Sequence, residues 1–256
     1  MTITIKSADE IEILRAGGKI LAAILDDLES MVAAGVSSLD IDDRAMELIG
    51  QYQVEPMTLG YKPQFADRPY PAASCVSVND VVVHGIPNEE PVIFNTGDIV
   101  SIDVVIAYKG LVVDSARTVG VGTISQPAQE LLTVTKKALS AGIDAAQPGK
   151  RVGAIGAAIE AVVPKRFGLI EVFCGHGVGY DLHEEPTIPN FGTAESGPVL
   201  EPGMVLAIEP MITLGSKEVE VLADGYTAVT ADGSLAAHME HTVLITKEGP
   251  EILTLQ

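Results

Sequence analysis

Apolar residues recur at helical spacing in several parts of the chain. Ser7 and Glu10 form an S-x-x-E capping signature at the start of the first repeat. The positions that follow come every three or four residues, at Ile11, Leu14, Gly18, Leu21, Leu25 and Leu28, and all but the glycine are large and apolar. This spacing predicts a long amphipathic helix that ends near Met31. Three further helices are expected at about 39–52, 127–146 and 152–163.

Segments rich in Val and Ile lie between and after these helices. Strands are expected at about 74–84, 98–106 and 111–122, and short strands alternate with Gly/Pro loops in the last third of the chain. The order of two helices followed by strands occurs twice, which is a weak internal repeat. We therefore predict an α+β fold. Because no linker or low-complexity tract divides the chain, we expect one domain over residues 1–256.

Two aspartates lie on the predicted hairpin SIDVVIAYKGLVVDSART (101–118). Pairing its strands about the midpoint of Tyr108 and Lys109 places Asp103 directly opposite Asp114. Facing partners have Cβ atoms only ~5 Å apart, and like charges there destabilise a sheet. A shared proton would remove the repulsion, and a bridging divalent cation would remove it more effectively if further ligands were present. A one-residue bulge at Gly110 would change this register.

Residues of the types that bind metal ions occur further along the chain. Glu209 and Glu240 lie in the apolar runs VLAIEPMI and MEHTVLIT, where an unpaired carboxylate would cost several kcal/mol. His176 lies in the glycine-rich CGHGVG, where the alternative is a loop histidine exposed to water. With Asp103 and Asp114 they make four carboxylates and one imidazole. This set suits manganese, iron, cobalt or zinc.

The other four histidines have two possible readings each. His84 could contact a substrate or could simply end a strand, and His183 could contact a substrate or pair with one of the two glutamates that follow it. His238 and His241 flank Glu240, so we expect them to support the site or the fold.

Composition predicts an acidic protein without a membrane span. The 256 residues include 35 acidic and 16 basic side chains, and the net charge of −19 disfavours direct binding to nucleic acid. No long apolar run or secretion signal is evident, so we expect no membrane association and a cytoplasmic location. Cys75 and Cys174, in a chain of this length, favour reduced thiols over a disulfide.

Five motifs follow one another along nearly the whole chain: NDVVVHGIP, SIDV with VVDSA, CGHGVG with HEEP, PGM with IEPM, and MEHT. In this order they resemble the type I methionine aminopeptidases. The resemblance implies the pita-bread fold, an antiparallel sheet flanked by helices with internal pseudo-twofold symmetry. It implies an enzyme with two divalent metal ions that removes the initiator methionine from nascent polypeptides with a small second residue. It further implies a monomer that docks transiently on the ribosome.

The same resemblance implies roles for individual residues. The metal ligands would be Asp103, Asp114, His176, Glu209 and Glu240. Asp114 and Glu240 would bridge the two ions, and Glu209 would also act as general base. His84 and His183 would contact the peptide or the tetrahedral intermediate. The pocket for the methionine side chain would be formed by Tyr61 or Phe65, Tyr70, Cys75 and Tyr226.

The chain departs from the family pattern at a few positions. Val105 and Ala207 stand where threonine is common, Tyr226 stands where tryptophan is common, and His238 stands where glutamine is common. The stretch 62–69 is longer than in compact relatives and could narrow the entrance to the methionine pocket. Because hydrogen bonds to the ligands tune metal affinity, the missing threonines could shift metal preference.

Three alternatives to this resemblance are disfavoured by the sequence. Prolidases and Xaa-Pro peptidases share the five ligands but carry a separate N-terminal domain, which would place the first aspartate well beyond position 103. Type II methionine aminopeptidases carry an inserted helical subdomain, and the 31 residues from Glu209 to Glu240 leave no room for it. A binding module without activity would be expected to have lost ligands, yet all five are present.

Overall fold

The computed structural model describes residues 3–63 and 66–255. In this part of the chain there are four helices, α1 (Ala8–Met31), α2 (Ser38–Tyr52), α3 (Gln126–Ala145) and α4 (Gly153–Val162). All four predicted helices are confirmed. Side chains of Ser7, Ser37 and Ser125 accept N–H groups of the first turns of α1, α2 and α3. These caps satisfy donors that have no partner within a helix, which explains why the helices begin there.

One antiparallel sheet is built around a long hairpin. Its strands are β1 (Glu55–Pro56), β2 (Ser74–Val78), β4 (Ile99–Tyr108) and β5 (Leu111–Gly120). β1 and β2 pair with β4 on one edge, and β5 pairs with it on the other. The predicted strand at 74–84 is divided, because Asn79 takes a left-handed φ of 56° and β3 (Val81–Val83) joins a different sheet.

A second antiparallel sheet is built from the C-terminal half. Its order is β15 (Pro250–Ile252), β14 (His241–Ile245), β9 (Val205–Ile208), β7 (Gly175–Gly177) and β8 (Glu184–Ile188). Two smaller sheets consist of β13 (Ala236–His238), β10 (Met211–Thr213) and β6 (Gly168–Leu169), and of β11 (Val219–Val221), β12 (Ala228–Thr230) and β3.

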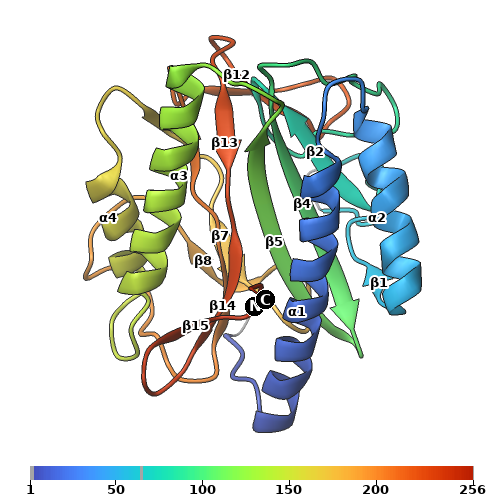
Figure 1. Cartoon of the computed structure of the whole chain (residues 1–256). Coiled ribbons are helices and arrows are strands. Elements are labelled where there is room, and N and C mark those ends of the chain that lie inside the picture. Colours follow the sequence, from blue (N-terminus) through green and yellow to red (C-terminus); the bar gives the residue numbers. More distant parts are fainter. Residues whose placement is uncertain (1–2, 64–65, 256) are drawn as a thin grey trace.

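The helices form two pairs, one for each half of the chain. Figure 1 shows α1 and α2 beside β4 and β5, and α3 and α4 beside the red and yellow strands of the second half, with the strands of both halves side by side in the middle. Each half has its own large apolar cluster: one centres on α1, α2 and the β4–β5 hairpin, the other on α3, α4, β9 and β14. This arrangement agrees with the weak repeat in the sequence.

The turn of the β4–β5 hairpin differs from the prediction. Lys109 and Gly110 occupy a two-residue turn with φ of 50° and 78°, and Tyr108 pairs with Leu111. Two successive left-handed residues are typical of a type I′ turn, whose twist matches that of the strands. The predicted midpoint between Tyr108 and Lys109 was therefore wrong.

The new register changes the partners of the two aspartates. Asp103 faces Ala116, and Asp114 faces Val105, so the aspartates are not directly opposite each other. The partner of each has shifted by two positions from the predicted pairing. Because side chains alternate along a strand, a shift of two keeps both aspartates on the same face of the sheet as diagonal neighbours.

Two glycines let α1 lie close to the strands and the C-terminal segment. A Cβ at Gly18 would lie 2.2 Å from the carbonyl oxygen of Leu253, and one at Gly17 would lie 3.2 Å from Cβ of Tyr108. Both glycines are buried. In the described part of the chain, no helix is both long and apolar enough to cross a membrane.

We predict that Gly18→Ala destabilises the protein by ~1–3 kcal/mol, because the added methyl group collides with backbone that cannot move independently. The matched control is Gly50→Ala in α2, an exposed position where a Cβ would meet nothing within 4 Å. That change should stabilise the helix by ~0.5–1 kcal/mol. Thermal unfolding followed by circular dichroism measures both. Equal effects of the two substitutions would contradict the packing argument.

Candidate metal centre and active site

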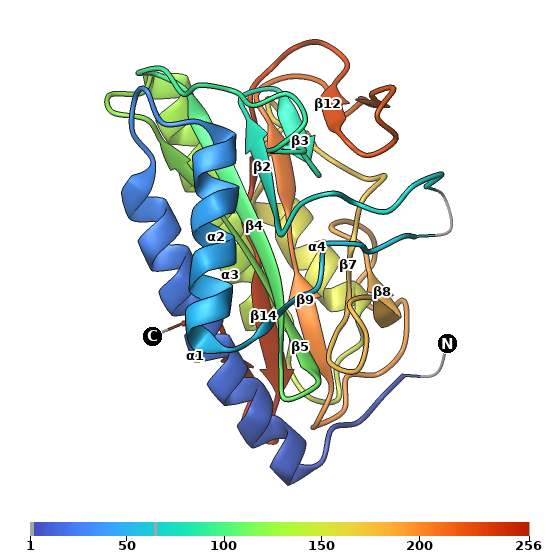
Figure 2. The same ribbon diagram turned by 90° about the vertical axis from the view of Figure 1, so that its right-hand side faces the viewer.

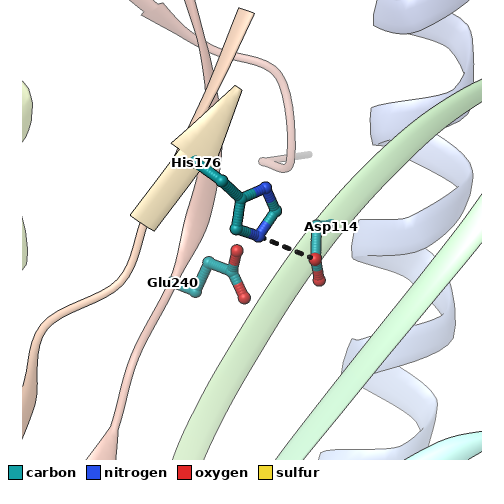
Figure 3. A group of neighbouring side chains, drawn as sticks. All are labelled: Asp114, His176 and Glu240. Carbon is teal, nitrogen blue, oxygen red and sulfur yellow. Dashed lines mark ion pairs between the residues drawn. The ribbon is translucent and has the colours of Figure 1, made fainter. Parts of the chain in front are cut away.

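The five predicted ligands come together where the two halves meet. Asp103 and Asp114 lie on β4 and β5, and His176 lies on β7. Glu209 follows β9 directly, and Glu240 lies between β13 and β14. Figure 3 shows His176, Asp114 and Glu240 converging from three different segments. A nitrogen of His176, an oxygen of Asp114 and an oxygen of Glu240 lie within 4.8 Å of one another.

Glu209 joins this group through the histidine. Nε2 of His176 lies 3.4 Å from Oε1 of Glu209 and 3.8 Å from Oδ2 of Asp114. The other oxygen of Glu209 lies 3.4 Å from Nε2 of His238, which is also 4.0 Å from an oxygen of Glu240. His238 thus contacts two of the predicted ligands, while His241 points elsewhere and its Nδ1 lies 2.8 Å from Oγ1 of Thr254.

Hydrogen bonds between the two halves of the chain hold the predicted ligands in place. The Thr242 hydroxyl accepts the N–H of Asp114 and donates to its carbonyl oxygen, at 2.8 and 2.7 Å. The Glu240 N–H donates to the carbonyl of Ala116, and the Ser115 hydroxyl donates to the carbonyl of Glu240. These bonds join β5 of the first half to the β13–β14 segment of the second half, so Asp114 and Glu240 are fixed relative to one another.

The carboxylates fit a divalent cation. Oδ1 of Asp103, Oδ1 of Asp114 and Oε1 of Glu240 are buried without a hydrogen-bond partner among the described residues. Buried polar atoms of native proteins nearly always have a partner, and oxygen atoms that converge without donors are the arrangement a cation needs. With His176, they provide the mixed oxygen and nitrogen ligands typical of first-row divalent metals.

The pKa values of the four carboxyl groups are shifted because the groups lie close together and away from water. Burial and the neighbouring carboxylates raise the pKa of Asp114 and of Glu240 well above the ordinary range, and burial raises that of Asp103 to about 6. Burial also acts to raise the pKa of Glu209, but His238 and His176 outweigh it and bring that pKa below its ordinary value. Glu209 is therefore ionised at neutral pH, whereas the other carboxylates resist ionisation together.

His84 and His183 lie at the edge of this cluster. Burial lowers the pKa of each to about 4, and the neighbouring His176 contributes to the shift at His183, so both imidazoles are neutral at pH 7. The ring centroid of His183 lies 4.4 Å from that of His176, and its Nδ1 lies 2.8 Å from the Tyr61 hydroxyl. The His84 ring packs edge-on against Phe173 at 5.7 Å.

His183 does not pair with the glutamate that follows it. Glu184 instead forms a buried ion pair with Lys6, Nζ to Oε2 at 2.7 Å. His84 has a left-handed φ of 59°, immediately after β3. It does end a strand, as one of the two readings expected, and its side chain also lines the cavity described next.

A cavity of about 440 Å³ opens beside the ligand cluster. Its walls include the predicted pocket residues Tyr61, Tyr70, Cys75 and Tyr226. Tyr70 and Tyr226 meet edge to face at 5.1 Å, and both are buried together with Cys75, Ala66 and Ala72. Burial raises the pKa of the Cys75 thiol well above its ordinary value, so this wall is uncharged. Phe65, the alternative to Tyr61, lies outside the described residues.

The stretch 62–69 contacts the wall of the cavity where it is described. Oη of Tyr226 donates hydrogen bonds to the carbonyl oxygens of Arg68 and Tyr61, at 2.5 and 3.4 Å. Pro63 lines the cavity and Ala66 is buried in the same apolar group. Tyr226 thus joins the stretch 62–69 to the pocket through its hydroxyl group. The tryptophan that is common at this position in the family has no such group.

Sequence reasoning missed several residues of the cavity. They are Thr58, Val83, Phe173, Leu182 and Met211. Phe173 and Leu182 directly precede CGHGVG and His183, respectively, so proximity to those motifs was the available signal. No periodic pattern in the chain distinguishes Thr58 or Met211 from core residues.

Comparison with known proteins identifies the family. The model of metallopeptidase family M24 matches residues 12–247. A methionine aminopeptidase of Aquifex aeolicus is 47% identical over 99% of each chain, and methionine aminopeptidase 1 of Bacillus subtilis is 42% identical over 98% of this chain and 99% of its own. The chain belongs to metallopeptidase family M24, among its type I methionine aminopeptidases. The resemblance seen in the five motifs is confirmed.

Solved structures agree with this family membership. The methionine aminopeptidase of Thermotoga maritima matches with a TM-score of 0.94 and 43% identity over the whole of both chains. A prolidase of Pyrococcus horikoshii matches with a TM-score of 0.75 and 21% identity, and the chain covers 63% of it. The pita-bread fold of the family is therefore confirmed. The prolidase shares this fold but is a longer protein, as the length argument anticipated.

We predict that the metal-free protein gains stability as the pH falls from about 8 to 6.5. The pKa values of Asp114 and Glu240 are raised well above the ordinary range, so each contributes stability at low pH that is lost as the pH rises through its folded pKa. Asp103, with a pKa of about 6, acts in the same direction only below that pH. Below pH 6.5, His84 and His183 act in the opposite direction. Their pKa is about 4 in the folded protein and higher in the unfolded chain, so the unfolded chain takes up protons at a higher pH and the folded state loses stability.

Urea unfolding of the metal-free protein at several pH values measures this dependence. Each proton taken up on folding changes the slope of the free energy of unfolding against pH by ~1.4 kcal/mol per pH unit. Asp114→Asn is the matched variant, because it removes one buried charge while keeping the shape of the side chain. It should stabilise the metal-free protein at pH 8 and flatten the slope. A slope equal to that of the parent protein would contradict the assignment of the effect to this cluster.

Proposed function

We propose that this protein removes the N-terminal methionine from polypeptides whose second residue is small, by metal-dependent hydrolysis of the first peptide bond. The observation that carries the proposal is the convergence of the five ligands beside an uncharged cavity of about 440 Å³. Membership of metallopeptidase family M24 and the names of its relatives support it. We also propose that residues 1–256 act as a single catalytic domain.

We propose two divalent ions as cofactors, with manganese, iron, cobalt or zinc as candidates. The residues that would hold them are Asp103, Asp114, His176, Glu209 and Glu240. Support comes from the three orphaned carboxylate oxygens and from the imidazole beside them. When bound, such ions polarise the scissile carbonyl and make water a nucleophile near neutral pH.

Glu209 is proposed as the general base. Its lowered pKa leaves the carboxylate ionised and able to accept a proton from the attacking water and to pass it to the leaving amine. Nε2 of His176 lies 3.4 Å from one carboxylate oxygen of Glu209, and Nε2 of His238 lies 3.4 Å from the other. The two histidines therefore restrain the orientation of the carboxylate. Such restraint keeps the acceptor oxygen in place while the proton moves.

His84 and His183 are proposed to donate hydrogen bonds to the substrate carbonyl as negative charge develops on its oxygen. Both imidazoles are neutral, so each can donate from one ring nitrogen and accept at the other. A Tyr61 hydroxyl that donates to Nδ1 of His183 selects the tautomer whose hydrogen lies on Nε2. That nitrogen is then a donor to the substrate.

The two parts of the site suit the two ends of an N-terminal methionine residue. Tyr70, Cys75 and Tyr226 offer an apolar, uncharged wall for the thioether side chain. The ionised carboxylate of Glu209 offers negative charge for a free α-amino group. A blocked amino terminus would lose this attraction. The proposed substrates are nascent polypeptides, met in the cytoplasm by a monomeric enzyme that docks only transiently on the ribosome.

Substrate choice provides a direct test. Met-Ala-Ser should be cleaved well, Leu-Ala-Ser and Phe-Ala-Ser poorly, and N-acetyl-Met-Ala-Ser not at all. An apolar pocket discriminates single methylene differences by only ~10–200-fold, so a norleucine peptide should still be cleaved. Values of kcat/KM across this series measure the preference, and Ala-Pro dipeptide is the control for prolidase activity. Comparable rates on the Leu and Met peptides would contradict the proposal.

Substitution of the two carboxylates in the tightest part of the cluster, Asp114 and Glu240, tests the metal assignment. Asp114→Ala and Glu240→Ala should each abolish binding of two ions and activity, while the circular dichroism spectrum stays that of the parent. Calorimetric titration with manganese or cobalt measures the stoichiometry. Binding of two ions at full strength by either variant would overturn the ligand set.

Substitution of the two neutral histidines separates ligands from substrate contacts. His84→Ala and His183→Ala should each lower kcat by ~10²–10³, the usual loss for one donor to a developing oxyanion. Their metal content, measured by atomic absorption, should equal that of the parent protein. Metal loss in His183→Ala would place that histidine among the ligands instead.

A further inference from the structure

A buried ion pair outside the ligand cluster ties the N-terminal segment to the loop that carries His183. Nζ of Lys6 lies 2.7 Å from Oε2 of Glu184, and the exposed fractions of the two side chains are 1% and 5%. Glu184 directly follows His183 in the chain and begins β8. A charge pair taken this far out of water costs free energy unless its hydrogen bonds are nearly complete. Such a pair therefore needs a reason beyond stability.

The carboxylate of Glu184 closes the loop between β7 and β8. Its Oε1 accepts the backbone N–H groups of Tyr180 and Asp181, the latter at 3.1 Å. Its Oε2 accepts from Lys6 and from the Thr4 hydroxyl. These bonds bring the pKa of Glu184 below its ordinary value although burial acts to raise it, so the carboxyl is ionised. One carboxylate thus holds the backbone on both sides of the loop.

Lys6 is in turn anchored to the body of the protein. Its N–H donates to the carbonyl of Gly203 at 2.9 Å, and its ammonium group lies 4.8 Å from the centre of the Tyr180 ring. Oη of Tyr180 donates to Glu10 at 2.8 Å, and the other oxygen of Glu10 accepts from Ser7 at the start of α1. Figure 2 shows this N-terminal segment, in dark blue, rising from α1 toward the loops beside β8.

The loop is shaped to receive the lysine. A Cβ at Gly179 would lie 2.3 Å from Cε of Lys6, and the φ of Gly179 is +144°, so only glycine fits there. On its other side the carbonyl of Gly179 accepts the N–H of Val112 of β5 at 2.7 Å. The loop is therefore packed between the N-terminal segment and the hairpin that carries both aspartates.

We propose that the Lys6–Glu184 pair is a positioning device for His183, so that the segment before α1 is part of the support of the active site. The backbone of His183 is held through Glu184, and its ring is held separately by Tyr61. Lys6 and Glu184 act through His183 and do not touch the reacting atoms. This inference rests on the proposed role of His183 as a donor to the substrate.

A double-mutant cycle tests the coupling, with Lys6→Met, His183→Ala and the double variant in their metal-loaded forms. Lys6→Met should lower kcat on Met-Ala-Ser by ~10-fold or more, because small misplacement of a reacting group is costly, while KM and metal stoichiometry stay unchanged. In the His183→Ala background the same substitution should change kcat by less than ~2-fold. Arg44→Met, which removes the surface pair with Asp27, is the control and should leave kcat unchanged.

A spectroscopic readout separates this inference from the proposed function. Lys6→Met should shift the imidazole ¹⁵N resonances of His183 and leave those of His84 unchanged, whatever the activity of the enzyme. Where Lys6→Met does not fold, Thr4→Val removes one hydrogen bond to Glu184 and should give a smaller loss in kcat, ~3-fold, that is again absent in the His183→Ala background.

Equal fold losses in both backgrounds, or unchanged His183 resonances, would overturn the positioning role while leaving the proposed function intact. A different outcome is that His183→Ala keeps full activity while Lys6→Met shifts the His183 resonances as expected. That result would remove the proposed role of His183 in the reaction, and with it the kinetic part of this inference.

Discussion

The crowding of four carboxylates between two helix-backed halves, two of them almost fully buried, is the constraint on which the rest of this structure depends. Asp114 and Glu240 are almost fully buried, and burial together with mutual repulsion raises the pKa of both. Such a group is costly without a cation, so the surrounding fold must supply the stability. The two large apolar clusters on either side, each backed by its own helices, meet this requirement.

Neither half contains a complete site. The β4–β5 hairpin contributes Asp103 and Asp114, and the strands of the second half contribute His176, Glu209 and Glu240. Hydrogen bonds of Thr242, Ser115 and Thr118 join the two sets across the seam. The candidate site therefore belongs to the packed pair of halves, and any change that shifts one half against the other will change the distances between the predicted ligands.

Two of the departures from the family pattern lie beside predicted ligands. Val105 is the cross-strand partner of Asp114, and Ala207 is that of His176. Threonine at either position would bring a hydroxyl next to a ligand, and here both neighbours are apolar. Thr242, which pairs with Ala207, instead supplies a hydroxyl to the backbone of Asp114. Because hydrogen bonds around a ligand tune metal affinity, these two positions bear on metal preference.

The sequence by itself predicted the helices, which the structure confirms, and the candidate ligands, which the structure brings together. Helix limits follow from local capping by residues such as Ser7, and the need of Glu209 and Glu240 for a partner follows from their apolar surroundings. Only the tertiary structure decided which contacts form over long sequence distances. The hairpin register depended on the conformation of Lys109 and Gly110, and the pairing of Lys6 with Glu184 joins segments 178 residues apart. Such pairings depend on the packing of whole elements, which no local pattern encodes.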